Sequence, residues 1–392
     1  MSASNRNRPL RVIAVGGAGS MGRWAVRTIA RLGSASVLTV ADLDLERAGR
    51  VAESVGAPCR TVRLDATESA QLRAAFADHD VVVNTMGPFA TFARPILEAA
   101  VESGCHYLDI NDDWQPTLDA FDLDGQARRR ELHVVVGLGG SPGVTNLCAA
   151  YGASKLDTVH ELHTGWKLSG ATIVDEPGFP APAASAAVEH WLHQCSQPVR
   201  AWVDGAAGWV EPVEEVELAF PGLGKVKGYT MGHPEPVTLP RRYPGLRSSL
   251  NLQSGPAWLL EYLREVSSRF AAGEFDLRTG AAMLADPPRG DAPAERSPLP
   301  VEWSLAIGEK NGLPCRVAVY PKAFHPAKMG GNTGIPLAVG VELLRRGELL
   351  DTGVHAPETA IDPRTFFDLL APLTEPGLRG ADDLLAVVEE TG

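Results

Sequence analysis

The sequence has no stretch of roughly 18 consecutive apolar residues, the length that a membrane-spanning helix needs. Its N-terminus, MSASNRNRPL, is polar and lacks the apolar core of a secretion signal. We therefore expect a cytoplasmic protein that makes no contact with a membrane.

Cysteine is scarce: the 392 residues include five, an odd number, and no C-x-x-C pair occurs. A disulfide framework and a zinc knuckle are therefore not expected, and reduced thiols fit a cytoplasmic protein. His160 and His163 lie in a strand pattern at a spacing that points them to opposite faces. The sequence predicts no metal site.

Positive charge is also in short supply, since 36 Lys and Arg face 48 Asp and Glu and the net charge is −12. Such a charge repels nucleic acid and anionic membrane surfaces. The first lysine is Lys155, so no earlier lysine can serve as a catalytic base. A hydrophobic share of 44% and a charged share of 21% are typical of a globular protein, and the length indicates two or three domains.

Glycine, in contrast, is concentrated in residues 11–22, RVIAVGGAGSMG. An apolar strand pattern leads into Gly17, Gly19 and Gly22 at G-x-G-x-x-G spacing, and a helical pattern follows. In a dinucleotide site these glycines allow the tight turn, the approach of the pyrophosphate and the packing of helix on strand. The phosphates would bind at the helix N-terminus. This context favours a dinucleotide-binding loop over an ordinary glycine turn.

An acidic residue follows at the separation that ribose recognition requires. A second strand pattern over residues 36–41 ends at Asp42, about 20 residues after Gly22. A carboxylate at this point repels a 2′-phosphate, so NAD is favoured over NADP. Arg47 lies close enough in sequence to leave NADP possible.

The first 150 residues alternate apolar runs with helical patterns such as 44–55 and 94–103, which predicts a doubly wound parallel sheet. The runs are nearly continuous, as expected for strands covered on both faces. We interpret residues 1–150 as a complete Rossmann domain of the α/β class. The expected strands are 12–15, 36–41, 60–64, 81–84, 106–110 and 132–136.

The pattern changes at about residue 156, and residues 151–327 read as an α+β domain for substrate binding and dimerisation. Residues 328–392 read as a C-terminal segment that returns to the Rossmann domain. There we expect a glycine-rich loop over 330–334 and helices over 335–346, capped by Asn332 or Thr333, and 364–370. In the middle domain the expected strands are 213–220, 224–231, 301–308 and 316–320, the helices 181–195 and 257–271, and the exposed loop 286–300.

Loops rich in small and polar residues follow the fourth, fifth and sixth strands, at 84–89, 106–112 and 137–146. In an open α/β sheet, ligands bind at the carboxyl ends of the strands. Residues 139–143 also match the G-x-S-x-G pattern of hydrolases. The residue after that serine is Pro142, which has no N–H for an oxyanion hole, so we reject a hydrolase.

Six segments in order resemble the saccharopine dehydrogenase-like family of NAD(P)-dependent oxidoreductases: GGAGSMG, VVVNTMGPF, GCHYLDIND, GLGGSPGVTN, GYTMGHPEPVTLPR and TGIPLAVGVELLRRGELLDTGVHAPE. The family includes saccharopine reductases, lysine 6-dehydrogenases, and carboxynorspermidine and homospermidine synthases. The resemblance implies hydride transfer to or from a carbon–nitrogen bond of an amino acid or polyamine. It also implies a homodimer in which the second domain supplies the substrate pocket.

The resemblance assigns roles to individual residues. Residues 139–146 would close the pocket, and Tyr107, Asp109 and Asn111 would face the reacting carbon. The cofactor would be held by Gly17, Ala18, Gly19, Ser20, Met21, Gly22, Asp42, Asp65, Asn84, Thr85, Gly87 and Pro88. The substrate would be held by Asn111, Ser141, Asn146, Arg241, Arg242, Asn332 and Thr333.

Oxidation of an amine needs a general base, and Asp109, followed by Tyr107, is the candidate. The alternatives are a strand-end cap for Asp109 and an ordinary strand aromatic for Tyr107. Arg241 and Arg242 could clamp a substrate carboxylate, or form a solvated basic turn. The alternative functions are an imine reductase of polyamine or specialised metabolism and a non-catalytic cofactor-binding regulatory protein.

Overall fold

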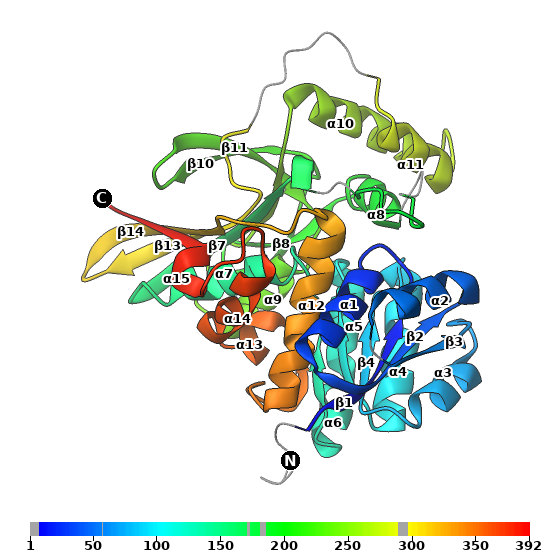
Figure 1. Cartoon of the computed structure of the whole chain (residues 1–392). Coiled ribbons are helices and arrows are strands. Elements are labelled where there is room, and N and C mark those ends of the chain that lie inside the picture. The colour runs from blue at the N-terminus through cyan, green and yellow to red at the C-terminus, as the bar shows by residue number, and fades with distance from the viewer. Residues whose placement is uncertain (1–7, 57, 171–172, 181–185, 289–296) are drawn as a thin grey trace. The chain divides into compact units, whose positions relative to one another are not determined.

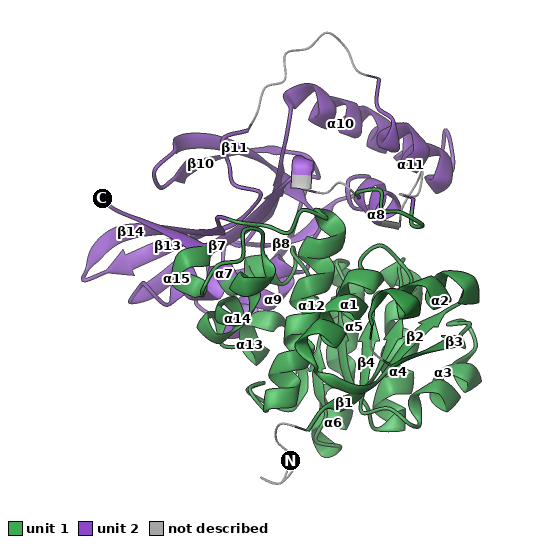
Figure 2. Cartoon of the chain, in the orientation of Figure 1, with its two compact units in different colours: residues 1–147, 173–179, 323–384 green, residues 148–172, 180–322, 385–392 purple. Residues whose placement is uncertain are grey.

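The computed structural model describes residues 8–56, 58–170, 173–180, 186–288 and 297–392, and the chain divides into two compact units (Figures 1 and 2). Unit 1 contains residues 1–147, 173–179 and 323–384, and unit 2 contains residues 148–172, 180–322 and 385–392. The chain therefore passes between the units several times, which differs from three consecutive domains. The expected helix at 181–195 and the loop at 286–300 lie partly outside the described residues.

Unit 1 contains a seven-stranded sheet in the order β15-β6-β5-β4-β1-β2-β3, and every neighbouring pair is parallel. The strands are β1 Leu10–Val15, β2 Ala35–Asp42, β3 Cys59–Arg63, β4 Val81–Asn84, β5 His106–Asp109, β6 His133–Val135 and β15 Gly353–His355. The helices are α1 Gly22–Leu32, α2 Leu45–Ser54, α3 Ser69–Phe76, α4 Phe89–Ser103, α5 Trp114–Ala120, α6 Asp124–Arg129, α12 Met329–Arg346, α13 Pro357–Ala360, α14 Pro363–Leu370 and α15 Ala381–Leu384. The predicted Rossmann fold is confirmed.

Helices cover both faces of this sheet, which explains why its central strands are apolar throughout (Figure 1). Helix α1 packs against α2 and α12, and α4 packs against α3 and α5. All four residues of β4 are buried. Helix α1 ends at Gly33, whose positive φ of 66° closes the helix in the left-handed conformation.

The predicted loop at 330–334 is wrong, because α12 begins at Met329 and runs through these glycines. Asn332 and Thr333 lie inside the helix and cannot cap it. A Cβ on Gly330 would lie 3.0 Å from the carbonyl oxygen of Ser20, and one on Gly334 would lie 2.3 Å from that of Met21. The glycines therefore permit close packing of α12 on the start of α1, and their function is not to break the helix.

Unit 2 is built on a mixed sheet in the order β10-β11-β12-β7-β13-β14-β16, in which the β12–β7 pair is parallel and the other pairs are antiparallel. A separate hairpin, β8 and β9, completes the strands. The strands are β7 Thr158–Lys167, β8 Val199–Val203, β9 Ala206–Val210, β10 Glu215–Phe220, β11 Gly224–Met231, β12 Asn251–Ser254, β13 Glu302–Lys310, β14 Leu313–Pro321 and β16 Leu385–Thr391. The helices are α8 Ala186–Gln194, α9 Glu235–Arg242, α10 Ala257–Ala271 and α11 Leu277–Ala285, while α7 Val144–Ala153 spans the boundary between the units.

The end of the chain departs from the expected C-terminal segment. Strand β16 pairs with β14 and extends the sheet of unit 2, whereas residues 323–384 belong to unit 1. The physical reason is that β14 would otherwise leave a row of backbone donors and acceptors without partners at the sheet edge.

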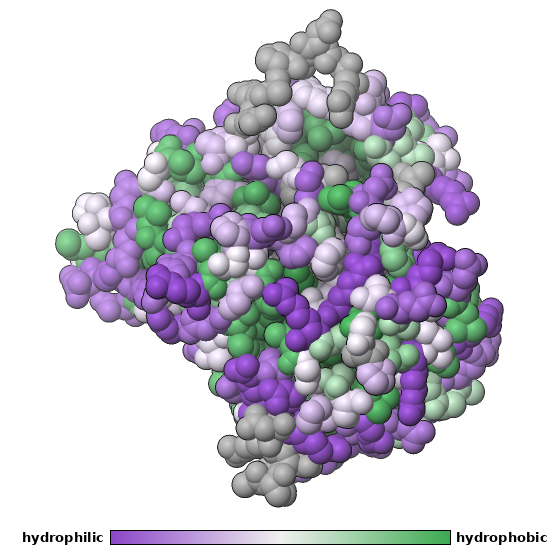
Figure 3. Space-filling view, viewed as in Figure 1, coloured by the Kyte–Doolittle hydropathy of each residue, from purple (hydrophilic) through white to green (hydrophobic). Residues whose placement is uncertain are grey.

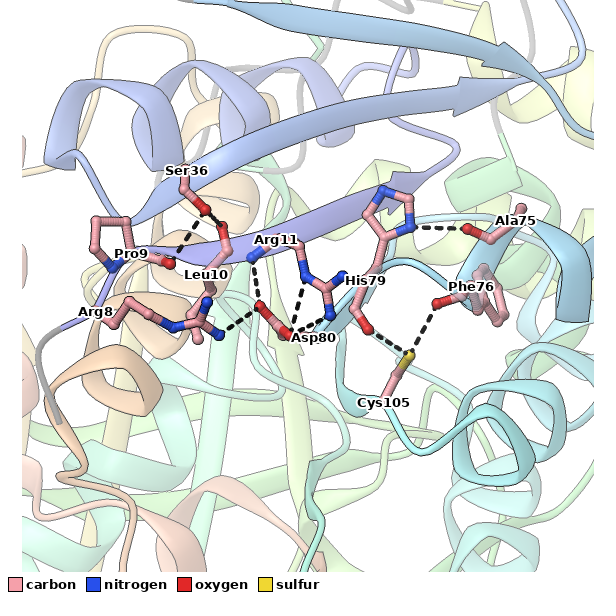
Figure 4. Close-up of polar contacts among 10 residues, drawn as sticks. All are labelled: Arg8, Pro9, Leu10, Arg11, Ser36, Ala75, Phe76, His79, Asp80 and Cys105. Carbon is pink, nitrogen blue, oxygen red and sulfur yellow. Dashed lines mark hydrogen bonds and ion pairs between the residues drawn. The ribbon is translucent and has the colours of Figure 1, made fainter. Parts of the chain in front are cut away.

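The amino-terminal edge of the unit 1 sheet is fixed by Asp80 (Figure 4). Its carboxylate accepts hydrogen bonds from the backbone N–H of Arg11 at 2.8 Å and from the Arg11 guanidinium at 2.8 and 3.2 Å. Arg8 adds a contact at 3.4 Å. Burial by itself would raise the pKa of Asp80, but the hydrogen bonds and charges of Arg11 and Arg8 outweigh it, so the pKa is lowered.

We expect Asp80→Asn to lower the free energy of unfolding by about 1 kcal/mol at pH 7, a modest value because the Arg11 side chain is 41% exposed and solvent screens the pair. Since the folded-state pKa is depressed, the contribution is present above the unfolded-state pKa and is lost as the pH falls through the folded-state pKa. Urea unfolding at pH 7 and pH 3 measures the difference. The exposed neighbour Asp78→Asn is the control, and equal effects of the two substitutions would contradict the assignment.

The exposed large apolar side chains lie on separate elements, for example Leu43, Trp209, Leu313 and Leu350. On the face drawn in Figure 3, hydrophilic residues surround hydrophobic ones. Within the described ranges, none of the helices combines the length and the apolar character needed to cross a membrane.

Candidate functional site

In the glycine loop between β1 and α1, a side chain at Gly17 or Gly22 would clash with neighbouring atoms unless these moved. A Cβ on Gly17 would lie 2.9 Å from the carbonyl oxygen of Ala14. A Cβ on Gly22 would lie 2.3 Å from the carbonyl oxygen of Gly16 and 2.7 Å from Thr85 Oγ1. The Gly19 N–H donates to the Gly16 carbonyl at 2.9 Å, which closes the turn. This is the geometry that brings a backbone loop and a helix N-terminus to a pyrophosphate.

The loop after β4 is joined to the glycine loop. Thr85 Oγ1 lies 3.0 Å from the carbonyl oxygens of both Val15 and Gly16, to which it donates. Asn84 is completely buried, and its side chain accepts from the Met86 N–H at 2.9 Å. These two residues therefore shape the loop. Gly87 is partly exposed and Pro88 is exposed, so the accessible part of this loop follows Asn84.

Asp42 lies beside the glycine loop, as the predicted ribose contact requires. One carboxylate oxygen accepts from the Ala18 N–H at 3.2 Å and the other from the Asp44 N–H at 3.1 Å. Asp65, in contrast, accepts from the N–H and the hydroxyl of Thr67, and these bonds lower its pKa. Asp65 therefore shapes the turn after β3, and its contact with adenine stays a prediction.

We expect Asp42→Ala to weaken NAD binding by about tenfold, because a charge-assisted hydrogen bond to a ribose hydroxyl contributes about 1.5 kcal/mol or more. NADP binding should weaken less or improve, since the carboxylate no longer repels the 2′-phosphate. Isothermal titration calorimetry with both cofactors measures the two dissociation constants. An equal loss for NAD and NADP would remove Asp42 from the ribose contact.

Asp109 and Tyr107, the predicted base and its neighbour, lie at the centre of a buried hydrogen-bond network. Asp109 Oδ1 accepts from the N–H of Gly137 at 2.7 Å and of Asn111 at 3.0 Å, and Oδ2 accepts from the Tyr107 hydroxyl at 2.9 Å. Asn84 Nδ2 donates to the same hydroxyl at 2.9 Å. The network thus ties together the carboxyl ends of β4, β5 and β6.

Both side chains are almost completely removed from solvent, with exposed fractions of 1% for Asp109 and 0% for Tyr107. Burial raises the pKa of Asp109 to about 6, although hydrogen bonds from Gly137, Asn111 and Tyr107 oppose the shift. Burial also raises the pKa of Tyr107, and the charge of Asp109 adds to this effect. These contacts support a loop-anchoring role, and the role of Asp109 as a base stays a prediction.

The candidate substrate residues Asn111 and Asn146 are also buried and hold loops. Asn111 donates to Thr117 Oγ1 at 2.9 Å and accepts from the Asp113 N–H at 3.0 Å. Asn146 accepts from the Gly143 N–H and donates to Glu358 Oε2, both at 2.9 Å. Their predicted contact with a substrate stays a prediction.

The turn that contains Ser141 is closed by a hydrogen bond from the Gly139 N–H to the Pro142 carbonyl at 2.9 Å, and Ser141 is partly exposed. Thr333 of α12 lies beside this turn, since a Cβ on Gly139 would lie 3.0 Å from its methyl group. The fold therefore brings two of the predicted substrate residues close together. Asn332 instead accepts from the His325 N–H at 2.8 Å.

Arg241 and Arg242 are exposed at the last turn of α9. Arg242 Nε donates to the Tyr243 hydroxyl at 3.2 Å. Both arginines belong to unit 2, whereas the other predicted site residues belong to unit 1. A carboxylate clamp at these positions stays a prediction.

The sequence reasoning missed an ion-pair cluster on α1. Glu176, in the short segment 173–179, accepts from Arg23 Nε at 2.9 Å, Trp24 Nε1 at 2.9 Å and Arg27 Nη1 at 2.6 Å. Phe179 lies under the Arg23 guanidinium at 5.1 Å. No local pattern could reveal these contacts, because about 150 residues of sequence separate the partners.

The cofactor domain has relatives of known family. Residues 12–174 match the family described as the saccharopine dehydrogenase NADP binding domain. Over 161 residues the chain is 26% identical to the proposed trans-acting enoyl reductases of Mycobacterium tuberculosis strains H37Rv and CDC 1551. The match covers 40% of this chain and spans 38% of the length of those relatives.

The whole fold is similar to the apo structure of saccharopine dehydrogenase (L-Glu forming) from Saccharomyces cerevisiae, with a TM-score of 0.59 and 13% sequence identity. The similarity covers 98% of this chain and 100% of the yeast chain, and at this identity it concerns the fold. The loop geometry and the matching domain together indicate that unit 1 binds NAD(P). Residues 12–174 are thus similar to the NADP binding domain of the saccharopine dehydrogenase family, and the whole chain shares the fold of the yeast enzyme.

Proposed function

We propose that the protein transfers a hydride between NAD(P) and a carbon–nitrogen bond of an amino acid. The observation that carries the proposal is the tightly packed glycine loop within a domain of the saccharopine dehydrogenase type. The cofactor supplies the hydride chemistry, so the protein has to bind the nicotinamide and orient the substrate carbon. NAD is the favoured cofactor because Asp42 lies beside the glycine loop.

In this proposal, the main task of the chain's own residues is to hold the cofactor and the substrate in place. The Asp109 network holds the loops after β4, β5 and β6 in one arrangement, and Ser141 and Thr333 lie at the turn that follows β6. A homodimer, as in many proteins of this family, is part of the proposal. Analytical ultracentrifugation across a concentration series tests it, and a monomer at all concentrations would contradict it.

A second candidate is the reduction of an enoyl carbon–carbon double bond, because the M. tuberculosis relatives are named for that activity. The same cofactor domain can serve either reaction, since the substrate is recognised by other parts of the chain. The two candidates differ in the substrate that oxidises the reduced cofactor.

The deciding experiment follows the absorbance of the reduced nicotinamide. The protein is incubated with NAD or NADP and a panel of amino acids, and in reverse with NADH or NADPH and either 2-oxo acid plus amine or an enoyl thioester. Amino-acid-dependent reduction supports the first proposal, and thioester-dependent oxidation supports the second. Cofactor binding by calorimetry with no turnover on any substrate would favour a regulatory protein over both.

A further inference from the structure

One face of the unit 2 sheet carries polar and aromatic side chains across three neighbouring strands. Glu302 of β13 is in register with Trp166 of β7, and Trp166 is in register with Gln253 of β12. Directly opposed residues project from the same face of a sheet and lie close enough to interact. We call these three side chains the Glu302 row.

Two members of the row are held firmly in place. Trp166 stacks on the ring of His233, with a centroid distance of 5.7 Å and an interplanar angle of 25°. Gln253 is completely buried and accepts a hydrogen bond from Trp191 Nε1 at 2.7 Å. The indole and the amide therefore form a preorganised polar surface.

The other polar groups of the row lack partners. The indole N–H of Trp166 is buried and donates to no acceptor among the described residues. Within the same part of the chain, the Glu302 carboxylate accepts no hydrogen bond and forms no ion pair. Buried polar groups are normally hydrogen-bonded, so the unmatched Trp166 N–H, beside a partly exposed carboxylate without a protein partner, calls for an explanation.

The electrostatic setting of Glu302 is consistent with this lack of a counterion. Burial raises the pKa of its carboxyl to about 8. The titratable groups around the row include the thiol of Cys148 on α7, whose own pKa is raised by burial and by the charge of Glu302, and the imidazole of His233. His233 in turn lies 3.7 Å from the Glu235 carboxylate and meets the ring of His190 at its edge, with a centroid distance of 5.4 Å. The ammonium of Lys167, the next residue after Trp166, donates to the Ser297 carbonyl at 2.9 Å.

A purely structural role explains the row poorly. Further along β13, helix α7 covers the same face of the sheet. There Ala306 of β13 lies close to Gly152 of α7, and both residues are small. Glu302 itself remains partly exposed. The carboxylate is therefore within reach of a ligand from solvent, and its position beside the unmatched Trp166 N–H points to a ligand site.

We propose that the Glu302 row binds the head group of an amino-acid substrate. In this arrangement the Glu302 carboxylate accepts hydrogen bonds from the substrate ammonium, and Trp166 Nε1 donates to a substrate carboxylate oxygen. The face of the indole adds a favourable interaction with the positive charge. The inference rests on the proposed function for the identity of the ligand, but the binding step requires no turnover.

The test measures binding of a matched ligand pair in the presence of saturating NAD by isothermal titration calorimetry. L-norleucine and hexanoate have the same carbon chain and carboxylate and differ in the α-ammonium. We expect norleucine to bind at least about tenfold more tightly than hexanoate, and Glu302→Gln to abolish that preference. Trp166→Phe should weaken norleucine clearly more than pentylamine, because pentylamine has no carboxylate and loses only part of the interaction with the aromatic face.

Proton release on ligand binding provides a second measurement, which would show no change if Glu302 had only a structural role. At pH 7 the Glu302 carboxyl is mostly protonated in the free protein, so pairing with an ammonium should release close to one proton. Titrations in buffers of different ionisation enthalpy measure this number. Glu302→Gln should release none, and the control Glu309→Gln, at an exposed residue of the same strand paired with His160, should behave like the wild type.

Thermal stability gives a further measurement, which can be made on Glu302→Gln even if this variant binds no ligand. Because the folded-state pKa is raised, the ionised carboxylate costs stability as the pH rises from the unfolded-state pKa through 8. The Tm of Glu302→Gln should therefore exceed that of the wild type by about 2–6 °C near pH 8.5 and match it near pH 5. Equal binding of norleucine and hexanoate by the wild type would overturn the proposal. If the protein nevertheless oxidises an amino acid, the proposed function is kept and only the assignment of the head-group site to the Glu302 row is wrong.

Discussion

Gly22→Ala should reduce NAD(P) affinity by about 100-fold or more, which corresponds to roughly 2.7 kcal/mol. The added methyl group would lie 2.3 Å from the carbonyl oxygen of Gly16 and 2.8 Å from the Gly17 Cα. Both are backbone atoms of the loop itself, so they cannot move aside as a flexible side chain could. The start of α1 would separate from β1, and the N–H groups that face the pyrophosphate would lose their arrangement.

The loss of cofactor affinity on substitution by alanine should be larger where a glycine has less space for a Cβ atom. A Cβ on Gly19 would meet the Gly16 carbonyl at 3.1 Å, so Gly19→Ala should have an intermediate effect. Nothing lies within 4 Å of a Cβ on Gly49 of α2, and Gly49→Ala should bind like the wild type and be slightly more stable. Calorimetric dissociation constants and Tm values for the three variants test this order. Wild-type affinity in Gly22→Ala would show that the loop is not the cofactor site.

Asp109→Ala should lower the free energy of unfolding by about 3–5 kcal/mol. The substitution removes the acceptor of three hydrogen bonds, from the Gly137 N–H, the Asn111 N–H and the Tyr107 hydroxyl. Each buried donor that is left without a partner costs about 1–3 kcal/mol. Because Asp109 is 1% exposed, water cannot replace the lost acceptor without rearrangement. Urea unfolding measures the loss.

Asp109→Asn separates anchoring from chemistry. Its amide oxygen can still accept from the two N–H groups, so its stability should lie much closer to that of the wild type. If Asp109 is the general base, turnover should fall by about 100-fold or more in this variant while cofactor affinity is kept. Wild-type turnover would make Asp109 a positioning residue, and an Asp109→Ala protein as stable as the wild type would contradict the anchoring role as well.

Much of unit 1 could be predicted from the sequence because its signals are local. Apolar runs alternate with helical patterns, and the resulting β1-α1-β2 order places Asp42 beside Ala18. The order of the sheet follows from short, right-handed connections between parallel strands. The same reasoning failed at residues 330–334. Glycine favours loops on average, but here α12 uses Gly330 and Gly334 to approach the backbone of Ser20 and Met21.

The roles of single polar side chains were harder to predict, because burial decides them and burial is a property of the packed structure. Asn84, Asn111 and Asn146 are all buried and accept hydrogen bonds from N–H groups of their own loops, and their predicted contact with a ligand stays a prediction. Glu302 looks like an ordinary strand residue, and only the pairing of β13 with β7 places it beside Trp166.

The sequence by itself therefore determined the cofactor domain and its glycine loop, since these depend on the periodicity and spacing of neighbouring residues. Only the tertiary structure decided which polar groups are satisfied. Asp109 found two donors in its own strand and loop and a third, the Gly137 N–H, after β6, whereas Glu302 found none among the described residues. The physical reason is that a hydrogen bond joins atoms that are near in space, and the folded chain decides which distant segments, such as the one after β6, come near.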